Sequence, residues 1–134
     1  MLDDRYSSEA IYDGSRNPTW RLQSAAEFLH QKSLAARRIW KDIDPTVAEN
    51  VCVILSRACW EGREVDISTF AEMLGKPRSS TLRLLKAWQQ EGYCDLRRVG
   101  RRTIIVGRPK MASKCREYLD TVADLLRFHE KDEA

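Results

Sequence analysis

The sequence lacks any long hydrophobic run, because no apolar stretch approaches the roughly 18–20 residues that a membrane-spanning helix needs. Its first five residues include two acids and no apolar stretch, so we expect no secretory signal and a cytoplasmic protein. Internal repeats and low-complexity segments are also missing. The 134 residues, 43% hydrophobic and 32% charged, are typical of an ordinary soluble chain with one domain, or one domain with extended arms.

Motifs that carry chemistry are also missing. The sequence has no phosphate-binding loop, no nucleophile paired with a base and no metal-ligand cluster, so we expect no enzyme activity, catalytic residue, cofactor or metal. The four cysteines lack the C-x2-C spacing of zinc and thioredoxin-like sites: Cys52, Cys59, Cys94 and Cys115. We expect most of them to be small buried hydrophobes. A redox-sensitive thiol is the alternative, and Cys94 is the best candidate because the arginines that follow it would lower a thiol pKa.

Positive charge is concentrated in one segment of the chain. Residues 76–110 hold ten basic residues against two acids, a net charge of +8. The whole chain carries +3, so the remaining residues carry −5. A basic segment on an otherwise acidic chain indicates a local surface for a polyanion, and the alternative is a solvated cationic face.

The first half of the chain predicts an arm and two helices. Residues 1–18 show no sustained periodicity and read as a flexible N-terminal arm. In residues 19–44 apolar side chains recur at helical spacing, which predicts an N-terminal helix, with a break near Ser33 as an option. The Asp-Pro pair at positions 44 and 45 is typical of a helix start, and the next helix should run to about Trp60.

A helix-turn-helix is predicted after a short extended piece. The first helix has about eight residues, is capped by Asp66 or Ser68, and ends at Gly75, since glycine tolerates the left-handed conformation. The second helix begins at Pro77 and continues to Gln90. Four residues at i, i+3, i+4 and i+7 share its inward face: Thr81, Leu84, Leu85 and Trp88.

A β-hairpin and a long helix complete the predicted fold. Residues 93–96 and 103–106 are rich in aromatic or β-branched residues and predict two strands, with four arginines and a glycine around the tip. The last helix should span residues 110–130, followed by a tail at 131–134, and its apolar residues have the spacing of a helix–helix seam. The fold class is therefore mainly α with a small β-hairpin, a winged helix-turn-helix at residues 45–109 between N- and C-terminal dimerisation helices.

This order of elements predicts double-stranded DNA as a partner. In a winged helix-turn-helix the second helix lies in the major groove, which is about 12 Å wide, while the hairpin follows the backbone or minor groove. A basic hairpin that only protects a sheet edge is the alternative for the wing. For Leu82, contact with a thymine methyl group and packing against another helix both stay open. The residues expected to bind DNA are Lys76, Pro77, Arg78, Ser79, Ser80, Leu82, Arg83, Lys86, Arg97, Arg98, Arg101 and Arg102.

Residues 70–93, FAEMLGKPRSSTLRLLKAWQQEGY, resemble the helix-turn-helix of bacterial winged-helix repressors. With a helix on either side of the winged unit, the layout over residues 45–128 is similar to the multiple-antibiotic-resistance regulator (MarR) family. The resemblance implies a homodimer joined by the terminal helices, a recognition helix at 77–90 and a wing at 94–106. The sequence departs from that family where an Asp-x-Arg pair is often found, because its wing has arginines but no aspartate to brace them.

We therefore predict a bacterial transcriptional regulator, a dimeric repressor that binds an inverted-repeat operator. Dimerisation is also expected because the seam on the last helix would leave an apolar stripe exposed in a monomer. The alternative function is a winged-helix subunit that binds other proteins in a larger assembly. The residues expected at the dimer interface are Trp20, Phe28, Met111, Cys115, Tyr118, Leu119, Val122, Leu125 and Leu126.

Four aromatic residues suggest where an unidentified small-molecule effector would bind: Trp20, Phe28, Trp40 and Trp60. They could line a crevice between the dimer helices and the DNA-reading unit. They could instead be core residues, because aromatic side chains on amphipathic helices usually are. Both interpretations stay open at this point.

Overall fold

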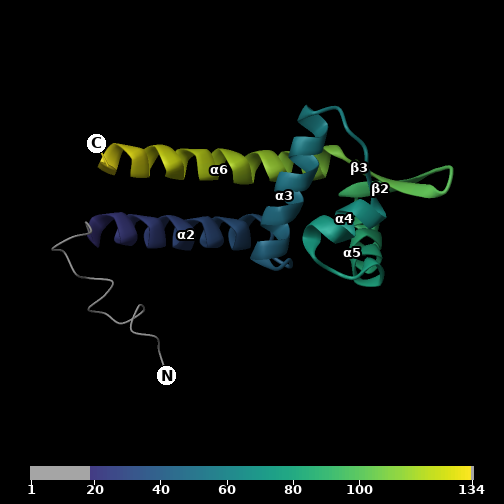
Figure 1. The fold of residues 1–134 in the computed structure, drawn as a ribbon, viewed down its shortest axis with the longest axis horizontal. Helices are drawn as coiled ribbons and strands as arrows, with labels where there is room; N and C mark the ends of the chain where they lie inside the picture. The colour runs from purple at the N-terminus through teal and green to yellow at the C-terminus, as the bar shows by residue number, and fades with distance from the viewer. Residues whose placement is uncertain (1–18, 134) are drawn as a thin grey trace, which may run out of the picture.

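The computed structural model describes the backbone of residues 19–133 and the side chains of residues 19–127. Two long helices lie side by side as a stalk, a third crosses their base, and two short helices with a small sheet form a head (Figure 1). The elements in chain order are α2 (Thr19–Ile39), α3 (Pro45–Trp60), β1 (Val65–Asp66), α4 (Ile67–Leu74), α5 (Arg78–Gln90), β2 (Cys94–Val99), β3 (Arg102–Gly107) and α6 (Pro109–Glu133). The arm expected over residues 1–18 lies outside the described residues.

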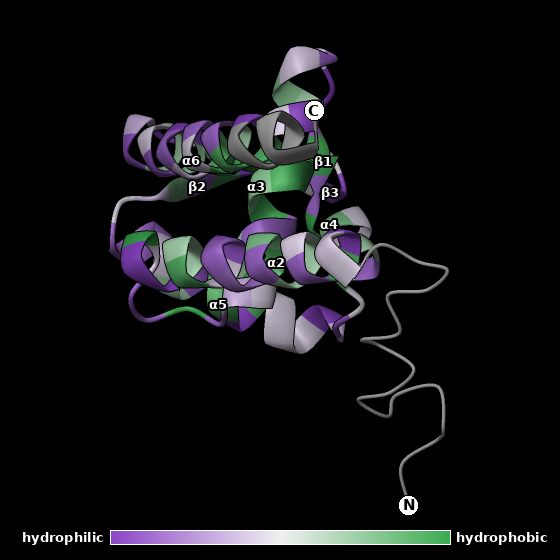
Figure 2. Ribbon diagram, turned by 90° about the vertical axis from the view of Figure 1, so that its left-hand side faces the viewer, coloured by the Kyte–Doolittle hydropathy of each residue, from purple (hydrophilic) through white to green (hydrophobic). Residues whose placement is uncertain are grey.

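Helix α3 supplies the hydrophobic centre between α2 and α6 (Figure 2). Its inward residues are all at most 5% exposed: Ala48, Val51, Cys52, Ile54 and Ala58. One carboxylate on α3 links both stalk helices. Glu49 accepts a hydrogen bond from the Lys32 ammonium of α2 at 3.0 Å and one from the Tyr118 hydroxyl of α6 at 3.5 Å. The three helices are therefore joined by burial and by a polar contact at the rim of their core.

The stalk meets the head at a cluster of three aromatic rings. Trp40 follows the end of α2, Trp88 lies on α5, and Tyr93 precedes β2. The ring centroids lie 6.2–6.5 Å apart, and both tryptophans are at most 3% exposed. Because aromatic pairs at this spacing add to the free energy of burial, this cluster fixes the head against the stalk.

The head contains the predicted helix-turn-helix. Asp66 caps α4 by accepting a hydrogen bond from the Thr69 amide at 2.7 Å, so the first of the two predicted caps is correct. Gly75 ends α4 in the left-handed region, at φ 69°. Helix α5 then begins at Arg78, one residue later than predicted. Of the four residues predicted on its inward face it buries Thr81, Leu85 and Trp88, and Leu84 is half-buried.

The sheet has three strands rather than the two predicted. β1 pairs with β3 through Val65 and Asp66, which places β3 between β1 and β2. The hairpin is also longer than predicted, because β2 and β3 form six cross-strand pairs and leave a turn of two residues, Gly100 and Arg101. Gly100 has φ 62°, as the first residue of a tight hairpin turn requires. Because these arginines are charged, the sequence predicted a loop here. The outer part of the hairpin covers no hydrophobic core, so its strands can carry charged side chains.

Two helix boundaries differ from the sequence predictions. Helix α2 is continuous through Ser33 but ends at Ile39, where the chain turns so that Trp40 enters the aromatic cluster. Helix α6 continues to Glu133, so a tail at residues 131–134 is wrong as far as the described backbone extends. None of the helices within residues 19–133 combines the length and hydropathy that crossing a membrane would need.

The aromatic cluster predicts a large difference between two tryptophans. Trp88→Ala should lower the free energy of unfolding by about 3–5 kcal/mol, because it removes a buried ring from the joint between stalk and head. Trp60→Ala makes the same truncation at a side chain that is 73% exposed. It should change the free energy of unfolding by less than about 0.5 kcal/mol. Denaturant unfolding at one protein concentration measures both, and equal losses would contradict the assigned role of the cluster.

Candidate nucleic-acid interface

The predicted DNA-contacting residues of the helix-turn-helix lie on its open side. Lys76 and Pro77 in the turn and the α5 residues Arg78, Ser79, Ser80, Arg83 and Lys86 are all exposed. Leu82 is half-buried and packs against the core, which favours packing over contact with a thymine methyl group. The inward stripe of α5 thus leaves a polar and basic face toward solvent, as its spacing predicted.

Several contacts hold α5 at both ends. At its start, the buried Thr81 hydroxyl donates to the Pro77 carbonyl at 3.0 Å, and the Arg78 guanidinium donates to the Ser68 hydroxyl of α4 at 3.2 Å. At its end, the Lys110 ammonium of α6 donates to the Glu91 carbonyl at 2.9 Å, where a cation complements the helix dipole. The same ammonium lies 4.3 Å from the Tyr93 ring centroid. Sequence spacing did not predict this role for Lys110.

The arginines of the hairpin are distributed along it rather than gathered at its tip. Arg97 and Arg98 lie on β2, Arg102 lies on β3, and Arg101 alone is in the turn. Arg97 pairs with Glu64 at 3.3 Å and Arg102 pairs with Asp66 at 3.1 Å. The side chains are exposed, and the hairpin extends away from the stalk as a wing (Figure 1).

Asp66 supplies the aspartate that the wing sequence lacks. One carboxylate oxygen caps α4 through the Thr69 amide, and the other accepts a hydrogen bond from Arg102 of the wing. These contacts, the Thr69 amide first, lower the pKa of the Asp66 carboxyl below its ordinary value. Asp66 thereby connects the helix-turn-helix to the wing. The sequence signal was its position as a helix cap, but the distance of 36 residues to Arg102 hid the second contact.

Some cations of this surface have no protein partner. Within the described residues, no hydrogen bond or ion pair engages the charged groups of Lys76, Arg83, Lys86 or Arg101. Three of them lie on the turn and on α5, and one lies at the tip of the wing. Unpaired, exposed cations on two neighbouring elements can bind phosphates of one duplex without first breaking an ion pair.

The residues expected at a dimer interface fall into two groups. Met111, Cys115 and Tyr118 are at most 5% exposed within the protomer, so the structure corrects their assignment: they cover α3 and are not available to a second copy. Six others lie on the outer parts of α2 and α6, with Trp20 and Leu126 about half exposed and the rest half-buried: Trp20, Phe28, Leu119, Val122, Leu125 and Leu126.

An open cleft of about 740 Å³ lies between α3, the sheet and the first turns of α6. Of the four aromatic residues considered for an effector pocket, Trp60 lines this cleft, whereas Trp40 is a core residue. Trp20 and Phe28 lie on α2, which contributes nothing to the lining of this cleft. Trp60 therefore fits the interpretation as a pocket residue, and Trp40 fits the interpretation as a core residue.

Cys94 does not have the environment predicted for a reactive thiol. Its side chain is fully buried, and its Sγ donates to the Leu85 carbonyl at 3.7 Å. Burial, with Asp95 adding to it, raises the pKa of Cys94 to about 11. The neighbouring arginines extend into solvent instead, so they do not stabilise a thiolate here. Among the described residues, no group of three His, Cys, Asp or Glu side chains is placed to hold a metal ion.

Comparison with solved structures identifies the fold. RV1404 from Mycobacterium tuberculosis superposes with a TM-score of 0.65 at 16% identity, over 82% of this chain and 74% of the other. The transcriptional regulator Tm0710 from Thermotoga maritima gives 0.59 at 18%, over 87% and 81%. The PcaV transcriptional regulator from Streptomyces coelicolor, solved with its natural ligand, gives 0.53 at 18%, over 96% and 81%. The chain has the fold of winged-helix transcriptional regulators of the MarR type. No protein-family model and no curated protein matches the sequence.

The double contact of Asp66 predicts a pH-dependent effect on stability. Asp66→Ala should lower the free energy of unfolding at neutral pH by about 1 kcal/mol, the usual value of a helix cap. Because the folded-state pKa of Asp66 is lowered, its contribution is complete above the ordinary carboxyl pKa of about 3.9 and is lost as pH falls through the folded value. The difference in free energy of unfolding between wild type and Asp66→Ala, measured by denaturant unfolding at several pH values, should therefore become smaller in acid.

Asp95→Ala is the matched control, because it removes an exposed carboxylate whose ion pair with Arg108 is 3.7 Å long. A surface pair of this kind contributes about 0–1 kcal/mol. The capping role would be contradicted if the loss in free energy of unfolding caused by Asp66→Ala stayed constant down to pH 2, or if it were no larger than the loss caused by Asp95→Ala.

Proposed function

We propose that this protein is a sequence-specific, double-stranded-DNA-binding transcriptional regulator that acts as a dimeric repressor. The observation that carries the proposal is the exposed basic surface of the turn and α5, with the unpaired Arg101 at the tip of the neighbouring wing, presented by a fold that known transcriptional regulators share. Helix α5 enters the major groove, and the wing contacts the backbone or the minor groove. Arg78 and Arg83 donate hydrogen bonds to guanine bases or bind phosphates, and Ser79 and Ser80 donate to phosphates. Further cationic contacts come from Lys76, Lys86 and the wing arginines Arg97, Arg98, Arg101 and Arg102.

The ion pairs of the wing favour a defined docking geometry. Arg102 is held by Asp66 and Arg97 by Glu64, so these side chains keep the wing in place relative to α4. Arg101 at the turn is free to enter a minor groove, whose negative potential attracts arginine. Two elements with separate tasks, one reading the major groove and one following the adjacent backbone, are what sequence-specific docking requires.

A homodimer is supported by the stalk. The α2 and α6 helices extend far beyond the head and carry exposed apolar side chains: Trp20, Leu22, Leu29, Leu34 and Leu126 (Figure 1). A water-soluble monomer would leave this surface without cover, whereas a two-fold dimer buries it and sets two α5 helices about one helical turn of DNA apart. Such a dimer would bind an inverted repeat in the cytoplasm, and regulation rather than enzyme activity is the function that this arrangement supports.

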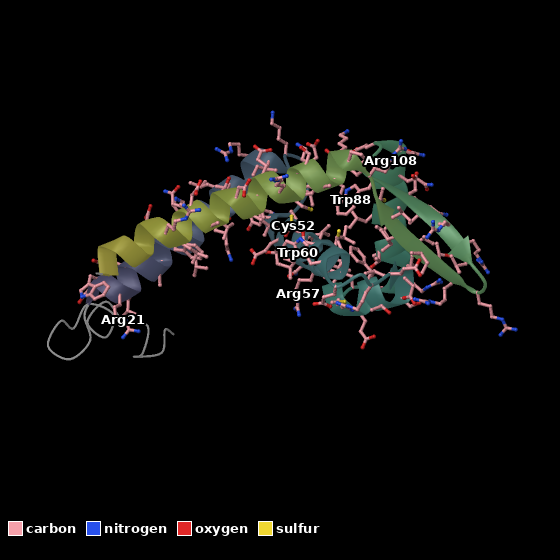
Figure 3. The ribbon with its side chains drawn as sticks, turned by 90° about the horizontal axis from the view of Figure 1, so that it is seen from above. Arg21, Cys52, Arg57, Trp60, Trp88 and Arg108 are labelled. Carbon is pink, nitrogen blue, oxygen red and sulfur yellow. The ribbon has the colours of Figure 1, made fainter. Side chains whose placement is uncertain are left out.

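Arginine substitutions test the DNA proposal and separate it from a protein-binding subunit. Arg83→Ala and Arg101→Ala should each weaken binding to a selected operator by about 1–3 kcal/mol and reduce the slope of log affinity against log salt by about 1. Arg21→Ala removes the same charge from the free end of the stalk and should leave both values unchanged (Figure 3). The operator comes from selection of bound sequences out of random DNA. Binding that is insensitive to salt, or equal in all three variants, would contradict the proposal.

Dimerisation is tested on the apolar surface of the stalk. Leu126→Glu places a charge at an exposed leucine of α6 and should convert the protein to a monomer with weaker operator binding, since burying an unpaired charge is strongly unfavourable. Val53→Glu places the same charge on α3 at a side chain of similar exposure and should leave the dimer intact. Sedimentation equilibrium measures both. A wild-type monomer, or loss of the dimer in the α3 variant alone, would show that the stalk is not the interface.

A further inference from the structure

Two lysines on the first turns of α6 bind the ends of two other helices. The Lys110 ammonium donates to the carbonyl of Glu91, at the end of α5, at 2.9 Å. The Lys114 ammonium donates to the carbonyl of Ile39, the last residue of α2, at 2.7 Å. Because the two lysines are four positions apart, they lie on one face of α6. We call this pair the lysine clamp.

The end of α5 is joined to the start of α6 at more than one point. The Lys110 ammonium also lies 4.3 Å from the Tyr93 ring centroid, and the backbone amide of Arg108 donates to the Tyr93 carbonyl at 2.9 Å. Within α5 itself, the carbonyls of residues 87–89 are already bound by the amides of residues 91–93. The Lys110 contact is therefore chiefly a link between two helices, added to an end that is largely closed without it.

The aromatic cluster and the lysine clamp constrain α5 in different ways. Burial of the rings of Trp40, Trp88 and Tyr93 is non-directional, so it stays favourable if the rings slide slightly against each other. A hydrogen bond from an ammonium to a carbonyl depends on both distance and angle. Stability at the joint thus comes mainly from the rings, whereas a defined angle requires the directional contacts.

We propose that the lysine clamp sets the angle at which α5 is presented to DNA, which makes Lys110 and Lys114 positioning residues that determine operator specificity. Lys110 holds α5 on α6, and Lys114 holds α6 on α2, so the stalk fixes the direction of α5. Neither lysine belongs to the surface proposed to bind DNA. The inference rests on the proposed function and adds to it the residues that orient the reading helix.

A small change at the clamp would become a larger one on DNA. Helix α5 has 13 residues. At about 1.5 Å per residue it is about 20 Å long, so a displacement of about 1 Å at its far end tilts it by about 3°. In the proposed two-fold dimer the tilt occurs in both copies, and it changes the separation of the two reading helices. Half-site spacing mirrors that separation, so it is the operator property that the clamp should control.

The role of Lys110 is tested by DNA binding of the full-length protein. Lys110→Met nearly keeps the length of the side chain and removes its charge, so the clamp is lost. Affinity for the selected operator should fall by about 10-fold, the value of one hydrogen bond to a charged group, because the DNA must then hold α5 in place by itself. Lys110→Arg should restore operator binding, since a guanidinium can donate to the carbonyl and stack on the ring.

Two matched lysine variants separate positioning from charge. Lys41→Met removes an exposed ammonium next to Trp40 that has no hydrogen-bond or ion-pair partner among residues 19–127, and it should leave the ratio of operator to random-DNA affinity unchanged. Lys86→Met removes a proposed phosphate contact and should lower the slope of log affinity against log salt by about 1, which Lys110→Met should not do. A lowered slope in Lys110→Met, or an equal loss of that ratio in Lys41→Met, overturns the proposal.

Operators whose half-sites are one base pair closer together or further apart test the angle itself. Wild type should prefer the selected spacing. Lys110→Met and Lys114→Met should each bind the three operators with more similar affinities, because a less constrained α5 adapts to either change. An unchanged preference in either variant overturns the proposal.

Hydrogen exchange without DNA separates a failure of this inference from a failure of the proposed function. In Lys110→Met the backbone amides of residues 85–93 should exchange faster than in wild type, whereas Lys41→Met should match wild type. If wild type binds an operator but Lys110→Met shows neither faster exchange nor lower specificity, the inference fails and the proposed function stands. If wild type binds no operator at any salt concentration, the proposed function fails and the inference fails with it.

Discussion

The aromatic contact of Trp40, Trp88 and Tyr93 is the constraint on which the rest of the architecture depends. Each ring comes from a different part of the chain: Trp40 follows the end of α2, Trp88 lies in the last turn of α5, and Tyr93 precedes β2. Burying them together fixes helix α5 relative to the stalk. The proposed DNA-binding dimer would need this rigidity, because the stalk would set the distance between two α5 helices and the cluster would transmit that distance to the surface proposed to face DNA.

Helix α6 reinforces the same joint with two lysines. Lys114 donates to the Ile39 carbonyl at the end of α2 at 2.7 Å, and Lys110 donates to the Glu91 carbonyl at the end of α5. Each ammonium satisfies a helix C-terminus whose last carbonyls lack partners within the helix. One short stretch of α6 therefore holds both the stalk and helix α5.

Asp66 fixes the position of the wing relative to the helix-turn-helix. A single carboxylate caps α4 and holds Arg102 of β3, while the backbone of β1 pairs with β3. Glu64 and Arg97 add a second link at the same edge of the sheet. Since the ion pairs are exposed, their value lies in orientation more than in stability. The wing and α4 consequently form one unit, which leaves Arg101 at the tip as the free cation.

Local patterns in the sequence are enough to predict the helices, the turn at Gly75, the inward stripe of α5 and the basic character of the surface that remains, because each of these follows from local periodicity, capping or charge. The packing of distant elements sets which apolar residues are buried inside one protomer. Met111, Cys115 and Tyr118 therefore belong to the core, although their spacing suggested a dimer interface. The same packing also decided that Asp66 braces Arg102, a contact between residues 36 positions apart. Local patterns show which face of an element is buried, but the partner that buries it is set by how distant elements pack.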